Sequence, residues 1–395
     1  MKILIHDYAG HPFTFDLSRK LAVYNNVIYA FTYASGGPKS GFVFDDDLSL
    51  EVHNIEFLEI NKNNFIVRFF QERFYGKKLV KVVGRENPDV IISANTPLQA
   101  QKELVKCASA LQIPFVFWLQ DIISIASQAI LRNKLGFAGS LVGKYFEIIE
   151  KQLLRKSVFT VTITEDFLPI LNDWGVPEEN ATAIPNWAPI EEIPKKPRDN
   201  DFARENGLMD KFVILYSGTL GMKHNPDIII NAARQLEKYQ DIEFVVISEG
   251  SGMDYLREHQ RTQPLSNLKL LPFQPFDIFP EVLGSADVLL TILEPEAGVF
   301  SVPSKVLSGL CAARPAVLVV PGENLAAKIV KSENAGFVIS DFSVDSFVEK
   351  TLYLKNNEEI AQKMGRNARN YAENNFQIKH IADKFEAIFR DLVTD

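Results

Sequence analysis

The sequence predicts an α/β protein made of two doubly wound domains that face each other across a cleft. In the first half, short apolar runs alternate with segments of helical periodicity, which is typical of βαβ units and a parallel sheet. Residues 185–208 are rich in proline and charge, as linkers are, and a second alternation follows them. In open parallel sheets, ligands bind outside the carboxyl ends of the strands, so we expect a small-molecule site in the cleft.

Each expected element rests on its own short pattern. The strands are apolar runs at Lys2–His6, Val27–Phe31, Asp89–Ser93, Phe115–Leu119, Phe159–Ile163, Phe212–Tyr216, Phe244–Ser248, Leu268–Leu271, Val288–Ile292, Ala316–Val320 and Phe337–Ile339. Helical stretches include Phe15–Tyr24, Leu98–Leu111 and the amphipathic Ile378–Val393. We expect an N-terminal domain over residues 1–190, a linker over 191–211, a C-terminal domain over 212–375, and a helix over 376–395 that packs back on the N-terminal domain.

Bulk composition excludes several classes of protein. Of the 395 residues, 46% are hydrophobic and 23% are charged, as in a globular protein. The net charge of -8 argues against a general nucleic-acid binder. Cys107 and Cys311 lie in apolar, helix-like contexts, so we expect no disulfide and a reducing cytosol. The opening residues form a first strand rather than a signal peptide, and no apolar run is long enough to span a membrane.

The C-terminal half carries a candidate phosphate seat. A loop follows the strand ending at Ile292, and a helix then opens at Pro303-Ser304-Lys305. The first-turn N–H groups of a helix lack helical partners, and its dipole favours an anion there. A structural loop before a buried helix, with Lys305 in solvent, is the alternative. This strand–loop–helix pattern, together with two further strand ends in the same half, favours a site that binds a nucleotide diphosphate.

Those two strand ends are individually weak signals. Ser217-Gly218 ends a strand before a glycine-bearing loop with Lys223, which suits a phosphate but also fits a plain βα turn. Glu249-Gly250 follows another strand, and Gly250 and Gly252 form only a Gly-x-Gly. Walker A, His-Glu-x-x-His, paired-cysteine and Gly-x-Ser-x-Gly motifs are absent from the sequence. Asp45–Asp47 fits a solvated loop better than a divalent-ion site.

The N-terminal half offers candidates for the acceptor side. Gly10 lets the loop after the first strand bend over the cleft, and His11 can reach a substrate, although a polar surface histidine is the slightly favoured interpretation. Asp121 directly follows an apolar strand, so it is an N-cap or a cleft carboxylate.

A local basic and aromatic stretch suggests a partner. Residues 64–85 place Phe65, Ile66, Phe69, Phe70 and Phe74 on one helical face and add Arg68, Arg73, Lys77, Lys78, Lys81 and Arg85. In a protein of net charge -8 this stretch suits an anionic membrane surface, and residues 131–137 are a second candidate. The alternative interpretation of residues 64–85, a packed helix with a solvated basic face, is about equally favoured.

Several motifs, in their order and spacing, identify a resemblance to a known family. They are residues 183–187 (AIPNW), 216–220 (YSGTL), 248–252 (SEGSG), 267–274 (NLKLLPFQ), 302–308 (VPSKVLS) and 311–315 (CAARP). The chain resembles the retaining, GT-B-fold glycosyltransferases of the glycogen-synthase-like group, family four. It is most similar to bacterial enzymes that build O-antigen and capsular polysaccharide. The likeness covers nearly the whole chain, and the fold it implies is two Rossmann-like domains.

The resemblance implies a nucleotide-sugar donor in the C-terminal domain and an acceptor in the N-terminal domain. It also implies retention at the anomeric carbon, with no cofactor and no obligatory metal. The donor-binding residues it implies are Gly218, Thr219, Glu249, Gly250, Phe273, Gln274, Glu296, Gly298, Val299, Phe300, Ser301, Val302, Pro303, Ser304 and Ser308. The catalytic candidates are Asp121, His11, Lys223 and Lys305, and the acceptor-side residues are Gly10, Phe13 and Gln120.

The chain also departs from the pattern of the family. Thr219 stands where the family often has a phosphate-binding arginine, and His224 occupies the place of the usual lysine, one position after Lys223. The family's Glu-x7-Glu pair falls on Phe300 and Ser308, although Glu294 or Glu296 could replace the first carboxylate. The histidine that many members carry in the N-terminal domain falls on Gln120.

We therefore expect a glycosyltransferase of the cytoplasmic membrane face, acting on a saccharide or lipid-linked acceptor. Lys223 or Lys305 would meet the charge that develops on the diphosphate, and Asp121, or else His11, would orient or deprotonate the acceptor hydroxyl. A nucleotide-sugar 2-epimerase shares the fold and needs no acceptor. A non-catalytic binding subunit of a glycan assembly complex is the other alternative, motivated by the missing Glu-x7-Glu pair.

Overall fold

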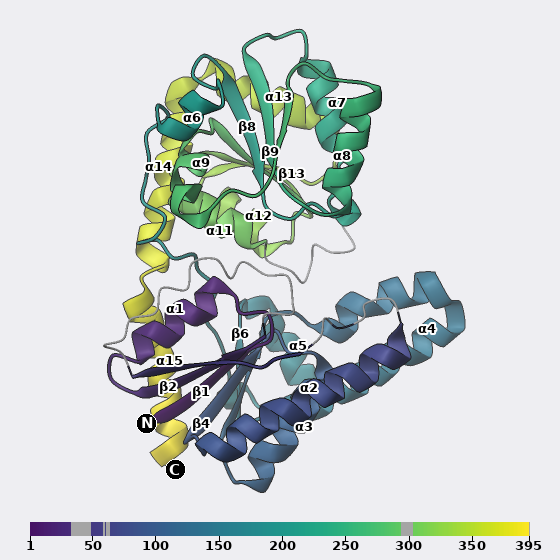
Figure 1. Ribbon diagram of the computed structural model, residues 1–395, viewed down its shortest axis with the longest axis vertical. Helices are drawn as coiled ribbons and strands as arrows, with labels where there is room; N and C mark the ends of the chain where they lie inside the picture. Colours follow the sequence, from purple (N-terminus) through teal and green to yellow (C-terminus); the bar gives the residue numbers. More distant parts are fainter. Residues whose placement is uncertain (33–48, 58–59, 61–63, 294–302, 395) are drawn as a thin grey trace. The chain divides into compact units, whose positions relative to one another are not determined.

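The computed structural model describes residues 1–32, 49–57, 60, 64–293 and 303–394, and it does not describe the side chains of residues 65, 126–135, 137, 138 and 223. The chain divides into two compact units (Figure 1). Unit 1 comprises residues 1–186 and 378–395, and unit 2 comprises residues 187–377. Residues 191–211 lie within unit 2, where Phe202, Ala203 and Leu208 are buried, so this expected linker contributes to the core of that unit.

Unit 1 is built on a seven-stranded parallel sheet with the order β3-β2-β1-β4-β5-β6-β7. Its strands are β1 (Lys2–Asp7), β2 (Asn26–Phe31), β3 (Leu50–Asn54), β4 (Val90–Ala94), β5 (Phe115–Leu119), β6 (Phe159–Thr162) and β7 (Ala181–Ala183). The direction of winding reverses between β1 and β4, which makes this pair the switch point of the sheet. The two edge strands, β3 and β7, are additional to the strands expected from sequence.

Helices cover the sheet of unit 1 (Figure 1). They are α1 (Pro12–Leu21), α2 (Phe65–Glu86), α3 (Leu98–Ala110), α4 (Ile123–Lys156), α5 (Leu168–Asp173) and α15 (Ile378–Thr394), with 3-10 turns η1 (Glu165–Phe167) and η2 (Glu178–Asn180). Local chemistry sets several ends: Pro12 opens α1, and the Asn64 side chain accepts from the N–H groups of Ile66 and Val67 at the start of α2. Gly136 interrupts α4 with φ of 56°.

The last helix, α15, belongs to unit 1 although the chain reaches it after unit 2. Its buried side chains, Ile381, Ala382, Phe385 and Phe389, recur at helical spacing. The Phe385 ring lies 4.8 Å from the Trp118 ring of β5, centroid to centroid. The C-terminal segment thus completes the core of the N-terminal unit.

Unit 2 repeats the same topology with a six-stranded parallel sheet of order β10-β9-β8-β11-β12-β13. The strands are β8 (Phe212–Ser217), β9 (Ile242–Ile247), β10 (Leu268–Leu271), β11 (Val288–Ile292), β12 (Ala316–Val319) and β13 (Gly336–Ile339). The helices are α6 (Asp201–Glu205), α7 (Asp227–Leu236), α8 (Ser251–Thr262), α9 (Phe279–Gly284), α11 (Ser304–Cys311), α12 (Leu325–Ser332), α13 (Val344–Asn356) and α14 (Glu358–Asn375), with 3-10 turns η3 (Met222–His224) and η4 (Phe276–Ile278). Here the switch point lies between β8 and β11.

Candidate functional site

Lys305 meets the carboxyl end of β8 at the switch point of unit 2. This residue lies in the first turn of α11, and its Nζ donates to the Tyr216 hydroxyl at 2.6 Å and lies 4.1 Å from the centre of the Tyr216 ring. Lys305 Nζ is also 3.5 Å from the carbonyl oxygen of Thr219. A lysine at a helix start, beside the end of the central strand, is an arrangement that suits a phosphate.

Gly218 makes this approach possible. Its φ of +129° disfavours a side chain, and an added Cβ would lie 3.2 Å from Cε of Lys305. The Ser248 hydroxyl, at the end of β9, donates to the Gly218 carbonyl at 2.8 Å. Ser248 therefore holds Gly218 in position on one side, and the missing side chain of Gly218 leaves room for Lys305 on the other.

The loops after β8 and β9 are tied together by backbone contacts. The Leu220 N–H donates to the Glu249 carbonyl at 3.0 Å, and the Gly252 N–H donates to the Leu220 carbonyl at 2.9 Å. Gly250 has a φ of +102°, and an added Cβ would lie 3.0 Å from the Leu220 carbonyl oxygen. Thr219, Glu249 and Gly250 are exposed at this edge, where a ligand can reach them.

His224 has a structural contact at the position where the resemblance places a lysine. It is buried, and its Nδ1 accepts from the Gly221 N–H at 2.9 Å, which closes the turn before α7. The side chain of Lys223 lies outside the described part of the structure.

The remaining donor-side candidates are distributed along the same sheet edge. Phe273 is exposed after β10, and Gln274 donates from Nε2 to the Pro272 carbonyl at 2.8 Å. Ser304 is exposed in the first turn of α11, Pro303 precedes it, and Ser308 is half-buried one turn later. Glu296, Gly298, Val299, Phe300, Ser301 and Val302 lie outside the described residues.

The switch point of unit 1 carries a carboxylate–imidazole pair. Asp7 ends β1 and is fully buried, whereas the His11 side chain is 34% exposed. His11 Nδ1 lies 2.9 Å from Asp7 Oδ2, and the Asp7 carboxylate also accepts from the Thr14 hydroxyl at 2.8 Å. Asn95, just after β4, donates from Nδ2 to Asp7 Oδ1 at 3.3 Å. Residues from both central strands therefore converge on one carboxylate.

Asp7 is ionised despite its burial. Burial by itself would raise the pKa of the Asp7 carboxyl, but the charge of His11 and the hydrogen bonds from His11 and Thr14 together lower it from 3.8 to about 2. At neutral pH, Asp7 is therefore a hydrogen-bond acceptor that cannot donate.

The other acceptor-side candidates lie at the same sheet edge with different contacts. Gly10 is buried with a φ of +70°, and an added Cβ would lie 2.7 Å from Phe31, so its place in the fold alone requires glycine. The Phe13 ring packs edge-on against Trp118, 5.5 Å between centroids. Gln120 is buried and accepts from Asn186 Nδ2 at 2.6 Å.

Asp121 is exposed and does not cap the following helix. The N-cap of α4 is Ile122, and the N–H groups of Ile123 and Ser124 donate to Glu150, further along the same helix, at 2.9 Å each. Glu150 is fully buried and satisfies the helix start that Asp121 was a candidate to cap. Among the described contacts, Glu150 and not Asp121 accepts from the N–H groups at the start of α4.

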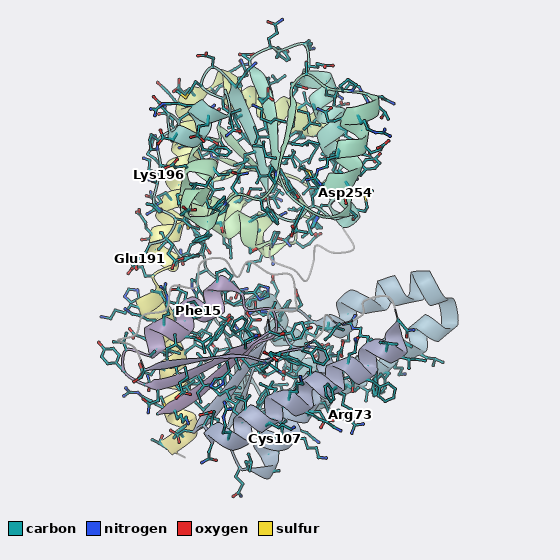
Figure 2. All side chains as sticks on the ribbon, viewed as in Figure 1. Phe15, Arg73, Cys107, Glu191, Lys196 and Asp254 are labelled. Carbon is teal, nitrogen blue, oxygen red and sulfur yellow. The ribbon has the colours of Figure 1, made fainter. Side chains whose placement is uncertain are left out.

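The outward face of α2 is apolar toward its start and basic further along. Ile66, Phe70 and Phe74 are 67%, 62% and 55% exposed, and they follow each other at a spacing of four residues. Exposed Arg73, Lys77 and Lys81 continue this face (Figure 2, where Arg73 is labelled). In the part of the chain that the structure describes, no helix has the length and apolar character needed to cross a membrane.

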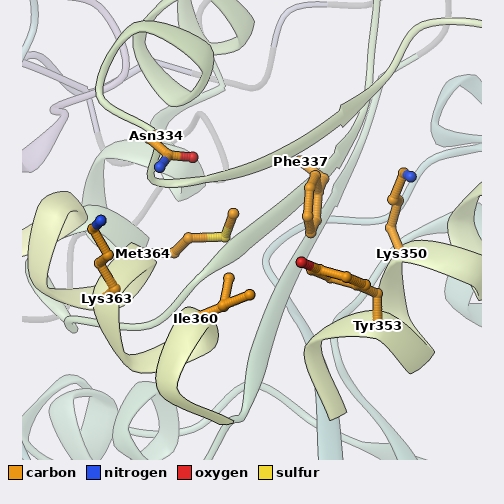
Figure 3. Close-up of a pocket in the computed structure, with 7 residues that line it drawn as sticks. All are labelled: Asn334, Phe337, Lys350, Tyr353, Ile360, Lys363 and Met364. Carbon is orange, nitrogen blue, oxygen red and sulfur yellow. The ribbon is translucent and has the colours of Figure 1, made fainter. Parts of the chain in front are cut away.

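Two other clusters lie away from both switch points. Glu51, His53 and Glu86 gather near edge strand β3. Lys2 pairs with Glu86 at 3.0 Å, Arg85 Nη2 lies 2.9 Å from His53 Nδ1, and His53 Nε2 lies 3.4 Å from Glu51 Oε2, so these side chains already have hydrogen-bond or ion-pair partners. A hollow of about 500 Å³ in unit 2 is lined by Asn334, Phe337, Lys350, Tyr353, Ile360, Lys363 and Met364 (Figure 3). It lies against β13, an edge strand of the sheet, beside α13 and α14.

Comparison with known proteins identifies the second unit. Residues 197–371 match the family model of glycosyl transferases group 1. This region is a group 1 glycosyltransferase domain. It contains every strand of unit 2 together with the switch point where Lys305 meets β8.

Individual proteins and solved structures are also similar to this chain. The chain is 27% identical over 192 residues to WcaI of Escherichia coli strain K12, a glycosyl transferase by name in colanic acid biosynthesis, covering 47% of each chain. It is 24% identical over 261 residues to UDP-Gal:alpha-D-GlcNAc-diphosphoundecaprenol alpha-1,3-galactosyltransferase of Escherichia coli, covering 65% of each. The chain thus spans between about half and two thirds of the length of these curated relatives.

A solved structure of HepE from Anabaena in complex with UDP and glucose has a TM-score of 0.73 and 16% identity to this chain, covering 99% of this chain and 100% of that one. This likeness confirms the GT-B fold, with its two Rossmann-like domains, that the sequence predicts.

Sequence reasoning missed Asp7 and Asn95. Both stand at the carboxyl ends of predicted strands, Lys2–His6 and Asp89–Ser93, and this position is a usable signal in a doubly wound sheet. The register pairs Asp7 with Ala94, which brings the loops after the two strands together.

Proposed function

We propose that this protein is a glycosyltransferase that moves a sugar from a nucleoside-diphosphate sugar to a saccharide acceptor, with retention of anomeric configuration, in the synthesis of a cell-surface polysaccharide. One observation carries the proposal: the group 1 domain contains the switch point at which Lys305 meets the end of β8. The relatives named for colanic acid biosynthesis and galactosyl transfer support the reaction class.

The chemistry of the leaving group fits this site. During transfer, the bond between the anomeric carbon and the β-phosphate oxygen breaks, and its electron pair leaves with the nucleoside diphosphate. The acceptor oxygen forms the new bond to that carbon and loses its proton. Lys305 and the first-turn N–H groups of α11 are fixed groups that would meet the developing negative charge. We propose no metal in this role.

Donor recognition would use the exposed edge of the same sheet. Thr219 follows β8, Glu249 and Gly250 follow the adjacent β9, and the backbone around Phe273 borders the edge after β10. The solved HepE structure holds UDP and glucose, which supports a uridine or related diphosphate as the first donor to test.

For the acceptor we propose a lipid-linked saccharide, met at the cytoplasmic face of a membrane. The galactosyltransferase relative acts, by its name, on a diphosphoundecaprenol-linked sugar. In this chain, the outward face of α2 joins exposed Ile66, Phe70 and Phe74 to exposed Lys77 and Lys81. Apolar side chains that can enter a bilayer, next to lysines that attract anionic headgroups, favour a peripheral membrane surface.

Vesicle binding tests this membrane surface. We expect binding to phosphatidylglycerol vesicles and weak binding to phosphatidylcholine vesicles. Removing two lysines from a membrane surface weakens binding roughly thirtyfold, and charge reversal should exceed that, so Lys77→Glu with Lys81→Glu is the decisive variant. The matched control reverses two exposed lysines of α15, Lys379→Glu and Lys384→Glu. Equal losses in both double variants, or none in either, would remove the α2 surface from the proposal.

A transfer assay tests the reaction. Candidate nucleotide sugars are incubated with a GlcNAc-diphospholipid, and the glycolipid product and released nucleotide diphosphate are quantified. We expect product with an anomeric configuration equal to that of the donor. An altered sugar in the nucleotide sugar itself, formed without acceptor, would instead indicate a 2-epimerase.

One observation favours a second candidate, a non-catalytic subunit that binds nucleotide sugars. Ser308 stands where the family has a ribose-binding glutamate, and a hydroxyl offers only a short contact there. Tight diphosphate binding together with no turnover across donors and acceptors would support this candidate.

A further inference from the structure

We propose that Tyr216 is a positioning residue of the donor site, which holds the ammonium of Lys305 at the end of β8, where the diphosphate of a nucleotide would bind. This inference rests on the proposed glycosyl transfer and deepens it. Both residues lie in unit 2. Tyr216 is not among the site residues that the sequence predicts.

Tyr216 has a fixed place at the switch point of unit 2. It is the last residue but one of β8, which adjoins β11 at the reversal of the sheet. Its side chain is 1% exposed and packs in the hydrophobic core that β8 shares with β9 and β11. A ring in a close-packed core has little freedom to move. Its hydroxyl is therefore a fixed point at the edge of the sheet.

The two hydrogen bonds of this hydroxyl have defined directions. An ammonium can only donate, so Lys305 Nζ donates to the Tyr216 oxygen, over 2.6 Å. The hydroxyl donates its own hydrogen to the Thr219 carbonyl at 3.1 Å. Burial raises the pKa of Tyr216, so the hydroxyl keeps that hydrogen at neutral pH. The chain from Lys305 through Tyr216 to Thr219 thus joins the first turn of α11, the end of β8 and the loop that follows it.

The aromatic ring gives Lys305 a second contact with the same residue. Lys305 Nζ lies 4.1 Å from the centre of the Tyr216 ring, within the range at which an aromatic ring attracts a cation. On the Gly218 side, an added Cβ would lie 3.2 Å from Cε of Lys305. The ring, its hydroxyl and the glycine together define where the ammonium stands.

A lysine needs such an anchor to act as a fixed charge. Its ammonium stands on a flexible four-carbon stem, and ordering such a stem when a ligand binds lowers affinity. Because Tyr216 orders the stem in the folded protein, that cost is met before a nucleotide arrives. Coulomb attraction acts over several ångströms, so the ammonium attracts a diphosphate while it keeps its contacts with the protein.

A double-mutant cycle tests whether Tyr216 acts through Lys305. Calorimetry measures the affinity of the wild type, Tyr216→Phe, Lys305→Ala and the double variant for UDP, GDP and TDP. For the diphosphate that the wild type prefers, we expect Lys305→Ala to weaken binding roughly 10- to 100-fold and Tyr216→Phe roughly three- to tenfold. In the Lys305→Ala background, Tyr216→Phe should change affinity less than about twofold, because the hydroxyl then has no ammonium to hold.

A role of Tyr216 apart from Lys305 gives a different result. The same loss from Tyr216→Phe in both backgrounds would mean that the hydroxyl acts on the Thr219 loop alone, and it would overturn the proposal. A loss of less than about twofold in Tyr216→Phe by itself would overturn it as well. The control is Tyr353→Phe, which removes a hydroxyl from an exposed residue of α13 and should leave the affinity unchanged. A wild type that binds none of the diphosphates would instead count against the proposed function.

A second measurement needs no nucleotide. In NMR spectra of the lysine ε-methylene groups of the whole protein, Lys305→Arg identifies the Lys305 signal. An aromatic ring shields protons that lie over its face, so we expect this signal upfield of those of exposed lysines. The displacement should shrink in Tyr216→Phe, where no hydroxyl holds the ammonium. An ordinary position in the wild type, or an unchanged displacement in Tyr216→Phe, would contradict the role of Tyr216.

Discussion

His6 lies next to Asp7 in β1, and its surroundings fix its protonation state. Its Nδ1 lies 2.9 Å from the Ser93 hydroxyl and 3.0 Å from that of Thr96. Those hydroxyls donate their own protons to Gln101 Oε1 and to the Ala94 carbonyl, so they must accept from His6. The Tyr75 hydroxyl, 2.9 Å from Nε2, is then the donor to the other nitrogen. His6 is therefore a neutral Nδ1–H ring.

This neutrality makes stability depend on pH. Burial, partly opposed by Asp7, lowers the pKa of His6 from 6.5 to about 4. Between these values the unfolded chain binds a proton that the folded protein does not, so stability falls as pH falls from 7 to 4, by up to about 3 kcal/mol.

Urea denaturation at pH 7 and pH 5 measures this effect. We expect the wild type to lose more free energy of unfolding over that interval than His6→Gln, whose side chain does not titrate. Parallel losses in the two proteins would show that His6 does not carry the dependence.

At the scale of elements, buried strands could be predicted and edge strands could not. Runs such as Val288–Ile292 are buried on both faces and therefore read as continuous apolar segments. The missed strands, β3 and β7, are sheet edges whose side chains are half-buried or exposed, so their sequences resemble loops. The helix expected within residues 64–85 from its helical spacing is α2, and the Asn64 cap stabilises its start.

The site was partly predictable for the same reason. Gly218 and Lys305 stand in a recognisable strand–loop–helix order, so local sequence alone makes both candidates, and the structure places them side by side. The partnership of Asp7 with Asn95 joins residues 88 positions apart, and the contact depends on the pairing of β1 with β4. Likewise, Asp121 looked like a helix cap because the true cap, Glu150, lies 26 residues or more further along the chain.

Glu150 gives a prediction for α4. It is buried and receives the Ile123 and Ser124 N–H groups and the Ser124 hydroxyl, so its removal leaves buried donors without acceptors. We expect Glu150→Ala to lower the free energy of unfolding by about 1–3 kcal/mol. Glu147→Ala on the same helix, which breaks a surface pair with Lys151, should cost less than about 1 kcal/mol. Chemical denaturation of both variants checks the contrast, and equal costs would contradict the capping role.

At the scale of the whole molecule, two units each hold a buried sheet and a switch point, but unit 1 is discontinuous in sequence. Its α15 follows unit 2 and supplies Phe385 and Phe389, both fully buried. Unit 1 therefore cannot complete its core until α15 has been made.

Phe385→Ala tests this dependence. Loss of a buried phenylalanine costs about 3–5 kcal/mol, and we expect that loss in the unfolding of unit 1, followed by the fluorescence of Trp118 beside it. Val393→Ala, at an exposed position of α15, is the control and should have little effect. An intact unit 1 transition in Phe385→Ala would mean that α15 is dispensable.

The most direct test of the donor site is the effect of nucleotides on thermal unfolding. The ligands are UDP, GDP, TDP, CMP and their common sugars. The proteins are the wild type, Lys305→Ala and, as a control, Lys363→Ala at the hollow beside β13. A ligand that binds only the native state raises Tm by mass action. We predict a selective rise with one diphosphate and its sugars, a much smaller rise in Lys305→Ala, and a full rise in Lys363→Ala. No rise with any nucleotide, or an undiminished rise in Lys305→Ala, would contradict a donor site at the β8–β11 switch point.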